Sequence, residues 1–140
     1  MTHIDAADEE EDAGAARALR GGWRVLALVL GVALSIFHLF AALVPALAEL
    51  TRNTIHFGGF ALLCALWFPA FRAARTGDGW LWLDLLLGAL VAAAAFYLSQ
   101  AESAIYDRGV RLTRLDWAAG IVVILGALEF TRRTAGLIIP

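Results

Sequence analysis

Four long apolar stretches restrict the folds that are open to this chain. They run over Val25–Leu47, Ile55–Phe71, Trp80–Leu98 and Leu115–Phe130. A helix rises about 1.5 Å per residue, and roughly 17–25 residues span the hydrocarbon core of a bilayer. The first and third stretches meet that length, and the second is near its lower limit. The fourth reaches it only with Glu129 and part of the segment that follows. The pattern predicts an all-α integral membrane protein with four transmembrane helices.

Composition and tryptophan placement agree with a membrane environment. Hydrophobic residues make up 61% of the chain and charged residues 17%, whereas soluble domains are about half apolar and about a quarter charged. Tryptophan collects at membrane–water interfaces, and the five tryptophans lie near the ends of the stretches. We therefore expect a membrane domain over residues 23–140 in contact with lipid, with helices over about 23–48, 53–71, 79–100 and 114–136.

The first 22 residues are interpreted as an acidic, disordered cytoplasmic tail. Their acidic run, Asp5–Asp12, differs from a secretory signal, which begins with basic residues. The formal net charge of the chain is −2, so we expect no nucleic-acid partner.

The distribution of arginine predicts the orientation in the membrane. All eleven basic residues are arginine, and short cytoplasmic loops carry the excess of positive charge. Seven arginines fall on the side of the two termini and the second loop, and four on the other side. Both termini are therefore predicted to be cytoplasmic, in a bacterial inner membrane. The first set is Arg17, Arg20, Arg24, Arg72, Arg75, Arg132 and Arg133; the second is Arg52, Arg108, Arg111 and Arg114.

Helix starts and helix contacts have their own signals. Asn53 or Thr51 is expected to cap the second helix and Asp78 the third, while Thr113 and Asp116 fit a capping box ahead of the fourth. Small residues let helices approach closely in lipid, which predicts packing faces on the last two helices. These residues are Gly88, Ala89, Ala92 and Ala93 on the third helix, and Ala119, Gly120, Gly126 and Ala127 on the fourth.

One group of ionisable residues is predicted at the cytoplasmic face. Asp84 lies one turn into the third helix, and Glu129 precedes Arg132 and Arg133 by three and four residues, which permits pairing along one helix face. The group is interpreted either as a self-neutralised helix end at headgroup level or as a docking cluster for another membrane segment.

A second polar group is predicted on the outer side. It holds His38, Arg52 and His56, and two histidines on adjacent helices raise the possibility of haem ligation. At the standard helical rise, His38 is about 14 Å from the predicted outer helix end and His56 about 5 Å. This mismatch disfavours haem, so we expect packing roles and no cofactor. The sequence also has no nucleophile–base pair or nucleotide-binding motif, so no enzymatic activity is expected.

Four segments resemble the four-helix part of TRAP transporters (tripartite ATP-independent periplasmic transporters), most closely the TAXI-type fused permeases. They are Leu34–Leu39, Arg52–Gly58, Trp82–Leu87 and Leu128–Gly136. The resemblance covers about residues 28–140, and the LEFTRRTAG string is its most specific part. The resemblance places eight residues at family positions, without a catalytic role. They are the four residues of the first polar group, both histidines of the second, Arg52 and Gly136.

The resemblance implies a small, non-catalytic subunit of a sodium-coupled transporter for organic anions. Its partners would be the large membrane subunit, which carries the substrate and sodium sites, and a periplasmic TAXI-type binding protein. The chain stops at Pro140, where fused members continue, so we expect a separate small subunit or the first part of a fused permease. Two alternatives are a four-helix exporter that acts as a dimer and a haem or quinone redox membrane protein.

The predicted orientation can be measured by cysteine labelling in intact cells. Single cysteines placed in the N-terminal tail should resist a membrane-impermeant reagent, because the tail is predicted to be cytoplasmic. Cysteines in the loop between the third and fourth helices should react. Labelling of the tail from the periplasmic side would contradict the topology.

Overall fold

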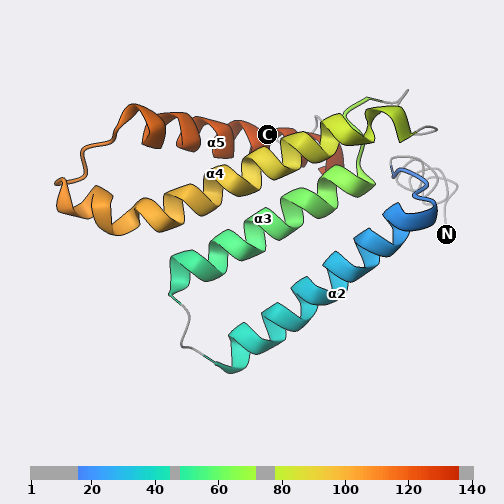
Figure 1. Ribbon diagram of the computed structural model, residues 1–140, viewed down its shortest axis with the longest axis horizontal. Coiled ribbons are helices and arrows are strands. Elements are labelled where there is room, and N and C mark those ends of the chain that lie inside the picture. The colour runs from blue at the N-terminus through green and yellow to red at the C-terminus, as the bar shows by residue number, and fades with distance from the viewer. Residues whose placement is uncertain (1–15, 45–47, 72–77, 136–140) are drawn as a thin grey trace, which may run out of the picture.

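The computed structural model describes residues 16–44, 48–71 and 78–135, and its regular structure there is helical. Four α-helices follow one another: α2 (Gly21–Leu43), α3 (Glu49–Trp67), α4 (Leu81–Asp107) and α5 (Arg114–Ala135). A short 3-10 helix, η2 (Asp78–Trp80), leads into α4. Figure 1 shows these helices as long antiparallel rods joined at their ends.

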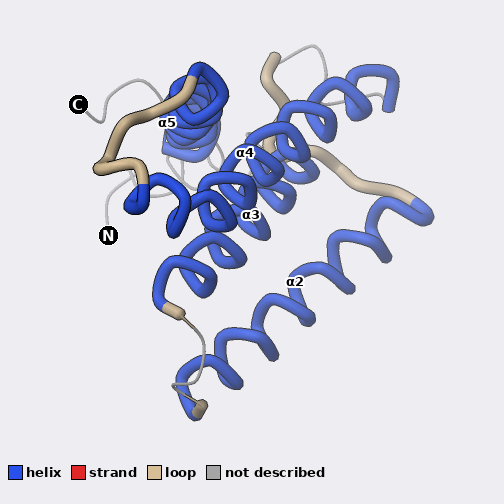
Figure 2. The backbone as a smooth tube through the Cα atoms, turned by 60° about the vertical axis from the view of Figure 1, so that its left-hand side comes forward, coloured by secondary structure: helices blue, strands red, loops and turns tan. Residues whose placement is uncertain are grey.

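The helices do not form a closed bundle. α3 and α4 make the most extensive contact, α5 packs on α4 and less on α3, and α2 packs on α3. Figures 1 and 2 show α2 at one edge of the molecule, with α4 and α5 on the other side of α3. Only three of the 23 residues of α2 are buried, namely Ala27, Leu34 and Ala41.

The described helices confirm the all-helical prediction, and two of them are long and apolar enough to cross a membrane. These two are α2 and α4. α3 carries several polar residues in its first two turns, and α5 has charged residues at both ends. Crossing of the membrane by all four helices therefore stays a prediction.

Several predicted boundaries are wrong by a few residues. α2 ends about five residues earlier than predicted and α3 about four. α3 also begins about four residues earlier, and α4 continues seven residues further to Asp107. Asn53 and Thr51 lie inside α3, which begins after Ala48 without a side-chain cap. An acidic residue in the first turn, Glu49, favours this earlier start through the helix dipole. The side chain of Asp78, the predicted cap of α4, lies outside the described residues.

The predicted capping box at the start of α5 is present. The Thr113 N–H donates to Asp116 Oδ2 at 2.6 Å, and the Asp116 N–H donates to Thr113 Oγ1 at 3.2 Å. Asp116 also accepts from the Tyr97 hydroxyl at 2.7 Å and from the Arg108 guanidinium at 2.9 Å. This buried carboxylate therefore ties the end of α4 to the start of α5.

The predicted tail of residues 1–22 is wrong at its C-terminal end. Arg17 and Leu19 are buried, the Arg17 N–H donates to the Trp67 carbonyl at 2.7 Å, and Gly21 and Gly22 belong to α2. Residues 1–15 lie outside the described residues. The ordered chain thus reaches back across the end of α3.

Small residues allow α3, α4 and α5 to pack closely, and two of them, Gly88 and Gly126, are among the small residues singled out from the sequence. A Cβ atom at Gly88 would lie 2.9 Å from Ala65 Cβ and 3.1 Å from the Ala61 carbonyl, and one at Gly126 would lie 2.3 Å from Val91 Cγ2. A Cβ at Gly120, in contrast, would meet nothing within 4 Å. Gly88 and Gly126 are therefore required for close packing, and Gly120 is not.

We expect Gly88→Ala to lower the unfolding temperature in detergent and Gly120→Ala to raise it slightly or leave it unchanged. Both variants gain about 1 kcal/mol of helix propensity. In Gly88→Ala alone, the new methyl group is too close to the Ala61 carbonyl and to the Ala65 methyl, and neither can move away by rotating a side chain. Such overpacking costs about 1–3 kcal/mol. Equal unfolding temperatures for the two variants would contradict the close α3–α4 contact.

Candidate functional site

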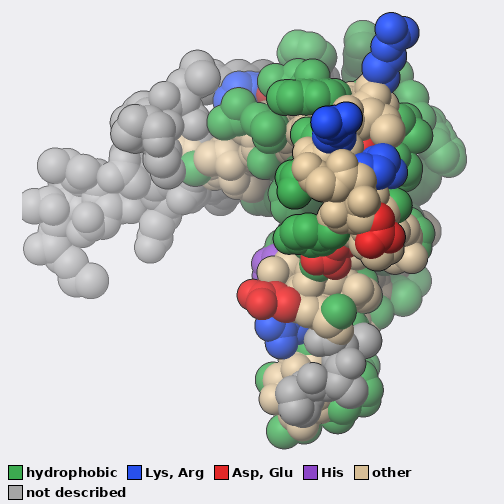
Figure 3. Space-filling view, turned by 90° about the vertical axis from the view of Figure 1, so that its left-hand side faces the viewer, with side chains coloured by type: hydrophobic (Ala, Val, Ile, Leu, Met, Phe, Trp, Pro, Cys, Tyr) green, Lys and Arg blue, Asp and Glu red, His purple; other side chains and the backbone are tan. Residues whose placement is uncertain are grey.

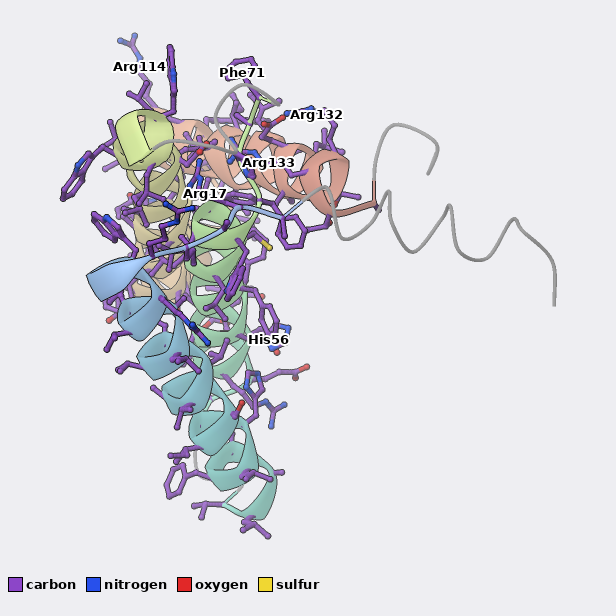
Figure 4. The ribbon with its side chains drawn as sticks, turned by 90° about the vertical axis from the view of Figure 1, so that its right-hand side faces the viewer. Arg17, His56, Phe71, Arg114, Arg132 and Arg133 are labelled. Atoms are coloured by element: carbon purple, nitrogen blue, oxygen red, sulfur yellow. The ribbon has the colours of Figure 1, made fainter. Side chains whose placement is uncertain are left out.

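Five charged side chains meet at the end of the molecule where α3 and α5 finish and α4 begins. They form what we call the charged cluster: Arg17, Asp84, Glu129, Arg132 and Arg133. Because α4 and α5 are antiparallel, the first turn of α4 lies beside the last turns of α5. Figure 4 shows the three arginines at this end, with His56 well apart from them.

Asp84 is the centre of the charged cluster. Its Oδ1 accepts from Arg133 Nη1 at 2.8 Å and from the Ala70 N–H at 3.3 Å, and its Oδ2 accepts from Arg17 Nη2. The side chains of Arg17, Asp84 and Arg133 are 1%, 5% and 3% exposed. This carboxylate therefore holds two buried guanidinium groups from opposite ends of the chain.

Glu129 forms the outer part of the charged cluster. It binds Arg132 through both carboxylate oxygens, each at 2.7 Å, and accepts from Arg133 Nε at 2.8 Å. Its side chain is 28% exposed and that of Arg132 is 39% exposed. Two-point pairing of this kind fixes the orientation of a guanidinium as well as its position.

The three arginines also bind the backbone carbonyls at the end of α3. The last four carbonyls of a helix have no partner within the helix and carry partial negative charge. Arg17 donates to the Ala65 and Leu66 carbonyls at 3.5 and 3.3 Å. Beyond the helix, Arg133 donates to the Phe68 carbonyl and Arg132 to the Ala70 carbonyl, both at 3.2 Å. The charged cluster therefore closes the C-terminal end of α3.

The structure brings together Asp84, Glu129, Arg132 and Arg133, the four residues singled out from the sequence, and adds Arg17. Sequence reasoning assigned Arg17 to a solvated tail. Arg17 lies four residues before an apolar helix and two before Leu19, which is buried. This position could have suggested that Arg17 is buried, but the sequence does not indicate that it pairs with Asp84.

The second predicted group is arranged differently from the expectation. His38 Nε2 and His56 Nδ1 are hydrogen-bonded to each other, so the predicted difference in depth is wrong. Since α2 ends at Leu43 and α3 begins at Glu49, the two residues lie about 8 Å and about 11 Å from the helix ends at the standard rise. Their direct contact leaves no space for a haem plane between the two ring nitrogens. Arg52, the third member of the predicted group, donates its backbone N–H to the Ala48 carbonyl.

Neither group resembles a metal centre. Across the described ranges, no three or more His, Cys, Asp or Glu side chains are placed to hold a metal ion. The carboxylates of the charged cluster are engaged by arginine. What the cluster can do is fix three helix ends and a connecting segment with respect to one another.

Comparison with protein-family models, curated proteins and solved structures gave no match.

We expect Asp84→Asn to destabilise the protein by about 3–5 kcal/mol, because it removes the buried negative charge that Arg17 and Arg133 share. Glu129→Gln should cost much less, about 1 kcal/mol, because its pairs are partly exposed to solvent. Chemical unfolding of both variants in the same detergent measures the difference. Equal losses would place Asp84 in a solvated environment.

Within the charged cluster, Glu129 and Arg132 should be energetically coupled. The double variant Glu129→Gln/Arg132→Gln is expected to lose less stability than the sum of the losses in the two single variants. Each single variant leaves one charged side chain without the other, whereas the double variant removes both charges. A double-mutant cycle by unfolding gives the coupling energy. Strict additivity would reduce the pair to two independent surface charges.

Proposed function

We propose that this chain is a small, non-catalytic membrane subunit that supports a larger transport unit. In this proposal it is the four-helix unit of a TRAP-type, sodium-coupled transporter for organic anions, in a bacterial inner membrane with both termini in the cytoplasm. Its partners are the large membrane subunit and, through it, a periplasmic substrate-binding protein. The proposal rests on the resemblance of the sequence segments and on the chemistry of the charged cluster.

The observation that supports a scaffold best is that the acids of the charged cluster are bound to arginines. Ionisable residues inside a membrane mark proton relays and ion pathways, and an acid that relays protons must exchange its partner during each cycle. Asp84 and Glu129 each accept from two arginines, and these arginines also bind backbone carbonyls. Opening such a group would break several hydrogen bonds at once, which suits a fixed support better than a moving gate.

The outer surface supports a membrane environment for all four helices. Soluble monomers rarely expose a contiguous apolar patch above a few hundred Å². Here large hydrophobic side chains are exposed on every helix, including α3 and α5, which are less apolar overall. Figure 3 shows hydrophobic side chains between the charged groups at the end that carries the α4–α5 loop. The exposed hydrophobic residues of these two helices include Ile55 and Phe60 on α3 and Trp117, Ile121, Ile124 and Leu128 on α5.

The structure bears on the two rival functions. An exporter acting as a dimer of four-helix subunits would use Glu129 as its membrane acid, but Glu129 is held by Arg132 and Arg133. A haem protein would use His38 and His56, which contact each other directly. No observation favours either rival over the scaffold.

Exposure within the charged cluster changes how docking should be tested. Arg133, a member of the predicted docking cluster, has a side chain that is only 3% exposed. Arg132 is 39% exposed and is the arginine of the described cluster best placed to reach a partner. Arg114 is exposed and begins α5, at the opposite end of that helix from the charged cluster, so it provides a matched control.

We expect the chain to co-purify with a TRAP-type large membrane subunit when the two are co-expressed. Arg132→Ala should lower the recovered complex several-fold, whereas Arg114→Ala should leave it unchanged, because only Arg132 belongs to the charged cluster. In liposomes, the chain alone should show no sodium-driven uptake of organic acids. Uptake by the chain alone, or no complex with any such subunit, would refute the proposal.

A further inference from the structure

The contact between His38 and His56 joins the outer halves of α2 and α3. Besides the hydrogen bond between Nε2 of His38 and Nδ1 of His56, the two rings stack edge to face with centroids 4.7 Å apart. Phe60 covers His56 at 4.7 Å between centroids. Neither the charged cluster nor the proposed scaffold role uses these side chains.

The backbone fixes where the protons of this pair lie. His38 Nδ1 is 2.6 Å from the Leu34 carbonyl, and a carbonyl can only accept, so Nδ1 of His38 carries a hydrogen. In neutral His38 the other nitrogen, Nε2, is then an acceptor. His56 must donate to it through Nδ1–H. The Nε2 atom of His56 therefore has a free lone pair when both rings are neutral.

This arrangement keeps its hydrogen bond when it accepts one additional proton, and loses it when it accepts a second. The first proton binds at His56 Nε2, and the hydrogen bond to His38 remains and becomes charge-assisted. A second proton must bind His38 Nε2, where it faces the N–H of His56. Two donors and two positive charges then point at each other, and the contact turns from attraction into repulsion.

The outer half of α2 has few other attachments. α2 packs on α3 and on the start of α4, and towards its C-terminal end it buries only Leu34 and Ala41. Leu34 lies over Gly59 of α3, where a Cβ atom would come within 2.7 Å of its Cδ1. A repulsive histidine pair would thus act on a helix end that buries few residues.

Few other charges surround the pair. α2 has no further ionisable side chain beyond Arg24, near its opposite end. On α3 the neighbouring ionisable groups lie toward its start, and α4 and α5, which pack on the other side of α3, contribute groups at the same end of the molecule. These groups are Glu49 and Arg52 on α3, Tyr97, Glu102, Tyr106 and Asp107 on α4, and Arg114 and Asp116 on α5, with Tyr97 and Asp116 bonded to each other.

We propose that His38 and His56 form a proton-operated latch between α2 and α3. The latch is closed while the pair holds at most one additional proton, and it opens when both rings are protonated, releasing the C-terminal end of α2. Histidine is the side chain that changes charge nearest to neutral pH, and the second proton joins a pair that already carries one positive charge, so the latch opens toward the acid end of that range. This inference does not depend on the proposed transport function.

Distances between spin labels on the full chain in detergent test the latch. In a Cys64→Ala background, labels at Leu43→Cys and Leu112→Cys report the end of α2 relative to the α4–α5 loop. Between about pH 8 and about pH 4.5, which bracket the titration of histidine, this distance should lengthen and its distribution broaden. Labels at Leu50→Cys and Leu112→Cys, which report the start of α3, should show no change.

Variants assign the response to the pair. His38→Gln/His56→Gln should abolish the pH response, because glutamine does not titrate, while Glu49→Gln and Arg52→Gln should retain it. An unchanged Leu43–Leu112 distance in the parent chain, or a response that persists in the double glutamine variant or disappears in Glu49→Gln, would overturn the proposal. Histidine ¹⁵N spectra of the unaltered chain offer an independent check, since both rings must carry their hydrogen on Nδ1 at about pH 8; the opposite tautomer of His38 would also overturn it.

Discussion

The unpaired carbonyls at the end of α3 impose the strongest constraint on this molecule. In a low-dielectric environment an unsatisfied backbone carbonyl costs several kcal/mol, and α3 ends among apolar helices. The protein meets this demand with guanidinium groups from outside α3. Placing three positive charges there then requires countercharges, which Asp84 and Glu129 supply. The position of α4 and α5 relative to α3 follows from this requirement.

The two ends of the molecule are held by different chemistry. At the cluster end, buried ion pairs and backbone carbonyls lock four segments together. At the other end, Asp116 joins α4 to α5 through Tyr97, Arg108 and Thr113, whereas α2 is held to α3 by the His38–His56 hydrogen bond and small apolar contacts. The glycines at the α3–α4 and α4–α5 contacts allow these helices to pack closely along their length. Rigidity is therefore concentrated in α3, α4 and α5, and α2 is the part with the most freedom.

Local patterns in the sequence predicted more than long-range ones. The apolar stretches gave four helices, and the Thr113–Asp116 spacing gave a capping box, because both depend on residues close in the chain. The spacing of Glu129, Arg132 and Arg133 likewise predicted their pairing on one helix. Arg17 was missed because its partners are 48 to 67 residues away. The histidine contact was missed because it depends on where α2 and α3 end, and helix ends are poorly marked here, with no side-chain cap on α3.

The long sequence separations in the charged cluster also dictate an order of events during synthesis. Arg17 leaves the ribosome first, Asp84 follows 67 residues later, and Arg133 arrives 49 residues after Asp84. Until the last turn of α5 is made, Asp84 lacks one of its two arginines and the Phe68 and Ala70 carbonyls lack their donors. A chain that has not yet reached the last turn of α5 thus leaves polar groups unpaired that the folded helices later enclose.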